Sequence, residues 1–200
     1  DRSRRTGQLP ELAELAADLK AEGRTPHEYL ADLFRRHGTH AERTFSLALP
    51  GAEGMERTQS LMNQFRTSPP PYLAGLDIVA IRDYANQTIT RRENRRGLAQ
   101  FAKSPEEFEP DPLPERGSRT NTNAPTAPQP LPGPKGDLVI LDTSADGTYL
   151  AVRPSGTEPK IKFYLFTYAP PNELQNVAAA REELAKRLEE MEGDLRAIAE

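Results

Sequence analysis

Arg153, Ser155, Gly156 and Thr157 lie within one short stretch and combine the groups that bind an oxyanion. The guanidinium of Arg153 offers a planar set of N–H donors that fits a phosphate or a carboxylate. Ser155 and Thr157 add hydroxyl donors, and Gly156 lets backbone N–H groups approach a ligand without a side chain in the way. Lys162 adds a cation further on. The stretch therefore predicts an anion-binding loop, although the same residues also allow a tight turn with a solvated basic rim.

The segments on either side of this loop read as strands. Residues 149–152 are apolar or aromatic. Residues 161–166 are mostly apolar or aromatic, and residues 160–163 alternate between polar and apolar positions. Lys160 and Lys162 fall on the face opposite Ile161 and Phe163, because successive side chains of a strand point to opposite faces. Downstream, residues 160–168 read as one strand, and Asp146 with Gly147 predicts a hairpin turn after a strand at 137–141.

The composition excludes several classes of protein. The 200 residues carry a net charge of -4, which argues against a general nucleic-acid or membrane binder. There is no cysteine, so the chain has neither disulfides nor thiolate metal ligands. His37 and His40 lack an obvious third zinc ligand, and Asp142 with Asp146 lacks the further ligands of a calcium loop, so no metal site is predicted. Residues 1–5 read as the middle of a longer chain.

The first part of the chain predicts two helices. Apolar residues recur at helical spacing over residues 12–19, and Gly23 is a natural stop. Thr25 and Glu28 then form a capping box for a second helix, which Gly38 ends. A strand is expected at residues 43–49, a helix at 51–66 and a strand at 76–84. Five residues of that middle helix are expected to face inward: Met55, Thr58, Leu61, Met62 and Phe65.

Periodicity is lost from about residue 86 to 136, where proline is abundant. The basic cluster at residues 91–96 reads as part of a solvated loop, with an RNA or an acidic partner as the alternative. Part of the stretch 86–136 could also lie against the sheet near the anion-binding loop. After Pro170 and Pro171, Asn172 is expected to cap a long helix that runs to Ile198. Its apolar stripe favours burial on the domain's own sheet and also allows a partner helix.

The string from Arg153 to Tyr164 closely resembles the phosphate-binding loop in the last domain of the α-D-phosphohexomutases, the phosphoglucomutase and phosphomannomutase family. Residues 51–56 and 79–84 resemble the opening of that domain, and the first helix pair resembles the end of the domain before it. The resemblance is loose over residues 9–84 and close over 137–168. It implies that Arg153, Ser155, Gly156, Thr157 and Lys162 hold the phosphate that is not being transferred.

The resemblance also implies a fold and a domain division. The expected class is α+β, with an antiparallel sheet of four or five strands covered by two helices, similar to the TATA-binding protein, and preceded by a helical pair. Residues 1–40 would be a remnant of the third domain. Residues 41–200 would form the C-terminal phosphate-binding domain, with a long Pro-rich insertion at about 86–136.

The implied function is that of a fragment of a cytoplasmic enzyme that interconverts hexose 1-phosphate and 6-phosphate. The fragment would anchor the substrate and act as a mobile lid. Its partners would be glucose or mannose phosphates, the bisphosphate intermediate and the missing N-terminal domains. No stretch resembles the family's phosphoserine loop, its aspartate-rich Mg2+ loop or its sugar loop, so no catalytic residue or cofactor is assigned here; Mg2+ is expected for the full-length enzyme. The alternative is a non-catalytic phosphate-binding or protein-interaction module of the same fold.

Overall fold

The structure is a computed structural model that describes residues 8–92, 127–174 and 176–199. Residues 93–96 of the basic cluster and most of the Pro-rich stretch lie outside these described residues, so the interpretations of them are untested. Among the described helices, none combines the length and the apolar character that a membrane span requires.

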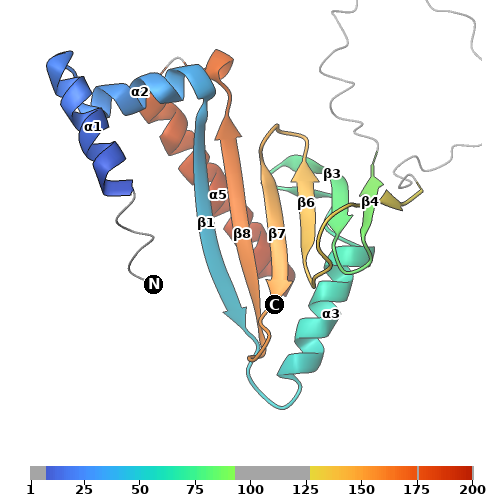
Figure 1. The fold of residues 1–200 in the computed structure, drawn as a ribbon. Helices are drawn as coiled ribbons and strands as arrows, with labels where there is room; N and C mark the ends of the chain where they lie inside the picture. Colours follow the sequence, from blue (N-terminus) through green and yellow to red (C-terminus); the bar gives the residue numbers. More distant parts are fainter. Residues whose placement is uncertain (1–7, 93–126, 175, 200) are drawn as a thin grey trace, which may run out of the picture. The chain divides into compact units, whose positions relative to one another are not determined.

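The described residues form four α-helices, one 3-10 helix and eight strands (Figure 1). The helices are α1 (Gln8–Ala21), α2 (Pro26–His37), α3 (Gly54–Thr67), the 3-10 helix η2 (Pro171–Glu173) and α5 (Val177–Ala199). The strands are β1 (Thr39–Ala48), β2 (Tyr72–Leu73), β3 (Leu76–Asp83), β4 (Thr88–Arg91), β5 (Gln129–Pro130), β6 (Val139–Thr143), β7 (Tyr149–Pro154) and β8 (Lys160–Ala169).

The strands form one open antiparallel sheet in the order β1-β8-β7-β6-β3-β4-β5, with β2 paired to β3. The α+β class is confirmed, and all five expected strands are present. The expected number of four or five strands was too low, because β2, β4 and β5 are short. β4 and β5 lie in the stretch that shows no periodicity, where two to four residues are too few to reveal an alternation.

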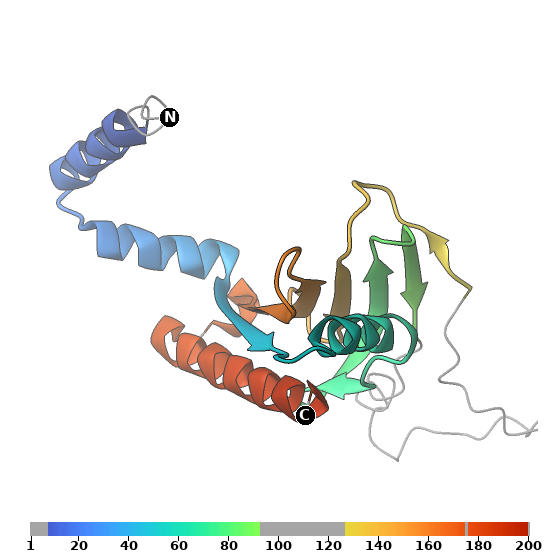
Figure 2. The ribbon, with the colours of Figure 1, turned by 90° about the horizontal axis from the view of Figure 1, so that it is seen from below.

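The larger of two compact units comprises Glu42–Thr167 and Lys186–Glu200 and holds the aromatic core. Ile161, Phe163 and Leu165 of β8 are fully buried on one face of the sheet. The Phe163 ring stacks on Phe45 of β1 at 4.8 Å, and Phe65 of α3 meets it edge-on at 5.8 Å. α3 also packs against β6 and β7, as the view from below shows (Figure 2). The alternation in β8 therefore leaves Lys160 and Lys162 on the other face.

Two details of the helices differ from expectation. Met55 in the first turn of α3 is 48% exposed instead of facing inward, because the buried face of this helix runs through Gly54, Thr58, Met62 and Phe65 and leaves Met55 at its side. The last helix is not capped by Asn172, which lies in η2. α5 begins at Val177, where the Asn176 side chain accepts hydrogen bonds from the N–H groups of Ala178 and Ala179. Leu188, Met191 and Leu195 of its stripe are buried, as expected.

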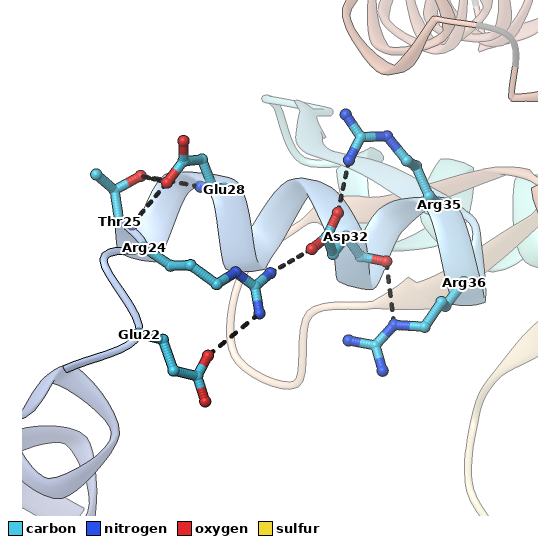
Figure 3. Close-up of polar contacts among 7 residues, drawn as sticks. All are labelled: Glu22, Arg24, Thr25, Glu28, Asp32, Arg35 and Arg36. Atoms are coloured by element: carbon cyan, nitrogen blue, oxygen red, sulfur yellow. Dashed lines mark hydrogen bonds and ion pairs between the residues drawn. The ribbon is translucent and has the colours of Figure 1, made fainter. Parts of the chain in front are cut away.

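The smaller unit comprises Asp1–Ala41 and Tyr168–Ala185. The predicted capping box is present at the start of α2: the N–H of Glu28 donates to Thr25 Oγ1, and the N–H of Thr25 donates to Glu28 Oε2 at 2.7 Å (Figure 3). Asp32 in the next turn pairs with both Arg24 and Arg35. These contacts fix the turn between α1 and α2.

Candidate phosphate-binding site

The loop that joins β7 to β8 is held at both ends by the pairing of the two strands. In their antiparallel register Arg153 lies opposite Lys162, and Pro154 lies opposite Ile161. The N–H of Ser155 then donates to the carbonyl of Lys160 at 2.9 Å. The strands thus bring Arg153 and Lys162 side by side on the face away from the aromatic core.

Two backbone contacts hold the far side of this loop. The N–H of Leu49 donates to the carbonyl of Pro159 at 2.8 Å. Gly54 packs in the same place, where an added Cβ would lie 1.9 Å from the Leu49 carbonyl oxygen and 2.9 Å from Cβ of Pro159. Glycine at this position lets the first turn of α3 lie against the loop. The chain therefore positions the loop between the end of β1 and the start of α3.

Beside the loop lies a hollow of about 800 Å³ within the larger unit. Arg153, Ser155 and Gly156 line it together, whereas Thr157 and Lys162 are not among its lining residues. Arg153 and Gly156 are exposed, and Ser155 is half-buried. Among the described residues, no hydrogen bond uses the backbone N–H of Gly156 or Thr157. Gly156 thus presents an unused backbone donor at the edge of a concave surface, and Thr157 presents another just outside it.

The charges of the loop divide into a paired and an unpaired set. Glu158 forms an ion pair with Lys160, and this hydrogen bond lowers the pKa of the Glu158 carboxyl below its ordinary value. The charge of Lys160 adds to the effect, as does the charge of Lys162 to a smaller degree. Within the described part of the chain, Arg153 and Lys162 have no ion pair. The loop consequently keeps two cations available for an anion.

For the remaining walls of the hollow, the sequence allowed only that part of residues 86–136 lies near the loop, and it named no residue. α3 contributes Met55, Thr58 and Gln59, and the segment before β6 contributes Pro134, Lys135, Gly136, Asp137 and Leu138. Met55 lies within residues 51–56, one of the stretches that carry the family resemblance, and no motif marks the other residues of these walls.

Arg66 of α3 fixes the position of the second wall. Its guanidinium pairs with Asp137 and also with Asp83 at 3.4 Å. The Asp83 carboxylate in turn accepts hydrogen bonds from the N–H groups of Ala85 and Asn86. One arginine therefore ties α3 to the end of β3 and to the start of β6.

The described residues offer no group of three or more acidic or histidine side chains that could hold a metal ion. Asp142, which was considered as a ligand, pairs with Arg82 instead. His40 stacks on Tyr168 with ring centroids 4.4 Å apart.

Comparison with known proteins gives a distant relation to one enzyme. The phosphoglucomutase of Staphylococcus aureus strain MSSA476 is 28% identical over 157 residues, which are 78% of this chain and 22% of that enzyme. Strain MRSA252 gives 28% identity over 162 residues, and strain N315 gives 26% over the same length. The chain thus spans less than a quarter of the length of the curated relatives it matches. No protein-family model matches.

Proposed function

We propose that this chain is the part of a hexose-phosphate mutase that anchors the phosphate which is not being transferred. The observation that carries the proposal is that Arg153, Ser155 and Gly156 line one hollow while the charge of Arg153 is unpaired among the described residues. The distant similarity to phosphoglucomutase supports it, since these enzymes act on phosphosugars.

The chemistry of the loop suits a phosphate dianion. The guanidinium of Arg153 would form two parallel hydrogen bonds to two phosphate oxygens, and Lys162 would add a point charge. Ser155, Thr157 and the N–H groups of Gly156 and Thr157 would fix the orientation of the remaining oxygens. None of these groups reads the sugar ring, so the loop by itself would not distinguish glucose phosphate from mannose phosphate. The same indifference would let either phosphate of a bisphosphate intermediate occupy the loop.

We assign to this chain no bond-making step. In a full-length enzyme the grip on a remote phosphate would position the reacting group and so contribute to rate as well as to affinity. The same part would close over the sugar as a lid. The Mg2+ expected for the enzyme does not fit the described residues, which offer no cluster of ligands, so we derive no step through it.

The proposal is tested by titrating the isotopically labelled chain with glucose 1-phosphate. We expect NMR shifts at Ser155, Gly156 and Thr157 and a Kd of about 1 mM, because a few exposed charged hydrogen bonds barely exceed the cost of association. Arg153→Ala should abolish the response. The matched control is Arg57→Ala, which removes an exposed arginine of α3 that does not line the hollow.

Glucose without phosphate should cause no shifts. A wild-type chain that gives none with tens of millimolar glucose 1-phosphate would overturn the proposal, and so would an Arg153→Ala variant that binds normally. The alternative of a protein-interaction module with no phosphate ligand predicts the first of these results.

A further inference from the structure

The hollow beside the β7–β8 loop has a second wall that carries a cation of its own. This wall is the segment Pro134–Leu138, which leads into β6. It carries Lys135, whose side chain is exposed and lines the same hollow as Arg153. Lys135 and Arg153 are far apart in the sequence, and they are not paired across strands. No sequence motif therefore links them.

The backbone of this wall is fixed by neighbouring strands. The N–H of Tyr84 donates to the carbonyl of Leu138 at 3.0 Å, and the N–H of Gly136 donates to the carbonyl of Tyr84 at 3.3 Å. Asp137 pairs with Arg66 of α3. Lys135 is therefore attached to a segment that is held on both sides.

The charge balance around the hollow leaves Lys135 available. Asp137 is the one acid among the lining residues, and its charge is met by Arg66. Glu158 on the neighbouring loop is met by Lys160. Among the described residues, Lys135 has no ion pair. The hollow is thus lined by two cations, Arg153 and Lys135, that lack an acidic partner in the described chain.

The size of the hollow exceeds that of a phosphate ion. At about 800 Å³ it falls in the range of pockets that take ligands much larger than a single phosphate. Met55, Pro134 and Leu138 give it apolar surface, and Gln59 and Tyr84 add side chains that can hydrogen-bond to hydroxyl groups. This combination fits a small anionic ester with a polar body.

We propose that Lys135 is a further cation of the anion site, contacts the phosphate from the segment before β6, and thereby seats the whole phosphosugar in the hollow. The proposal rests on the proposed function, because it assumes that Arg153 holds a sugar phosphate. It adds a binding residue from a segment outside the loop. Lys135 is a ligand-contacting residue here and takes no part in bond making.

The test compares the affinity of the chain for glucose 1-phosphate among variants at position 135. We expect Lys135→Ala to weaken binding about fivefold, the effect of removing one solvent-exposed ion pair. Lys135→Arg should bind within about twofold of the wild type, because the charge is kept. Lys135→Glu should bind more weakly than the alanine variant, since its carboxylate would compete for Arg153. Lys186→Ala is the matched control, because it removes an exposed lysine of α5 that does not line the hollow.

The outcomes separate the two proposals. If the wild type does not bind, or if Arg153→Ala binds normally, the proposed function fails. If Arg153→Ala abolishes binding while Lys135→Ala and Lys135→Glu bind as the wild type does, only the role of Lys135 fails. If Lys135→Arg loses binding as Lys135→Ala does, the residue has a structural role, and this result would also overturn the inference. Urea unfolding of each variant checks that the fold is retained.

Discussion

Arg153 and Lys162 lie directly opposite each other in the antiparallel pairing of β7 with β8. Like charges in directly opposed positions destabilise a sheet by roughly 0.2–1 kcal/mol. Neither cation has an acidic partner within 4 Å among the described residues. The pair therefore costs stability when the loop is empty, and a bound anion would remove that cost.

Replacement of Lys162 should separate stability from binding. We expect Lys162→Gln to raise the free energy of unfolding by about 0.5 kcal/mol at low salt, because the repulsion with Arg153 is lost. The same variant should bind glucose 1-phosphate about fivefold more weakly. Urea unfolding and NMR titration measure the two effects. Lys186→Gln should change neither, and a Lys162→Gln variant that is both less stable and equally good at binding would contradict the interpretation.

Gly156 should matter for binding and not for folding. An added Cβ meets no atom within 4 Å, and the backbone is not in the left-handed region, so Gly156→Ala should change stability by less than about 0.5 kcal/mol. The new methyl group would obstruct the backbone N–H groups that face the ligand. Affinity for glucose 1-phosphate should fall about tenfold, the equivalent of one lost charged hydrogen bond. An unchanged Kd would show that the ligand does not approach this part of the backbone.

Gly54 should show the opposite behaviour. A methyl group there would lie 1.9 Å from the carbonyl oxygen of Leu49, which is backbone and cannot turn away. Gly54→Ala should therefore cost about 3 kcal/mol or more. Gly193→Ala in α5 is the control, because its added Cβ meets nothing and it should gain about 0.5–1 kcal/mol of helix stability. Equal urea midpoints for wild type and Gly54→Ala would refute the close packing.

The affinity of the loop for an anion should depend on the ionisation of Glu158. The hydrogen bond from Lys160 lowers the pKa of the Glu158 carboxyl below its ordinary value of 4.5. The ion pair therefore contributes to the stability of the folded chain above pH 4.5, and this contribution is lost as the pH falls through the lowered pKa. Protonation removes a negative charge beside the loop. Sulfate, which stays a dianion, should therefore bind the wild type more tightly as the pH falls below 4.5.

Glu158→Gln tests this reasoning. The variant should bind sulfate about twofold more tightly than the wild type at pH 6, because its side chain carries no charge at any pH. It should also lack the gain in affinity at low pH. A variant that shows the same pH profile as the wild type would assign the effect to another carboxyl.

Arg66 should be important for stability. The Asp83 carboxyl side chain is 9% exposed, so removal of its cation leaves a nearly buried charge with hydrogen bonds alone. We expect Arg66→Ala to lower the free energy of unfolding by about 2 kcal/mol and to broaden the NMR signals of Pro134–Leu138. Arg57→Ala on the same helix should change stability by less than about 0.5 kcal/mol. A small effect of Arg66→Ala would mean that the backbone N–H groups of Ala85 and Asn86 and the Asn86 side-chain amide suffice for Asp83.

The sequence predicted the elements whose signals are local. Thr25 and Glu28 specify their capping box within four residues, and the alternation around Phe163 specifies both faces of β8. The cap of α5 was misplaced because Asn172 and Asn176 are equally good capping residues, and only the path of the chain after the prolines selects between them. β4 exists because β3 offers it an edge, and β5 because β4 does, which is information that their own residues do not contain.

Part of the site was predictable because its signals are local in the sequence. The loop residues are contiguous, so their chemistry could be read directly, and their role in binding stays a prediction. Lys135 and Met55 reach the hollow only through tertiary packing. Their neighbours in sequence give no indication of a ligand, and the order of strands is needed to bring them beside Arg153.

The bond between Leu49 and Pro159 joins positions more than a hundred residues apart in the chain. Contacts of such long range are slow to form, because the entropy of a large closed loop must be overcome first. The anion site should therefore be completed late, after the intervening strands have assembled. Ligand binding during refolding would then report the last stage of assembly.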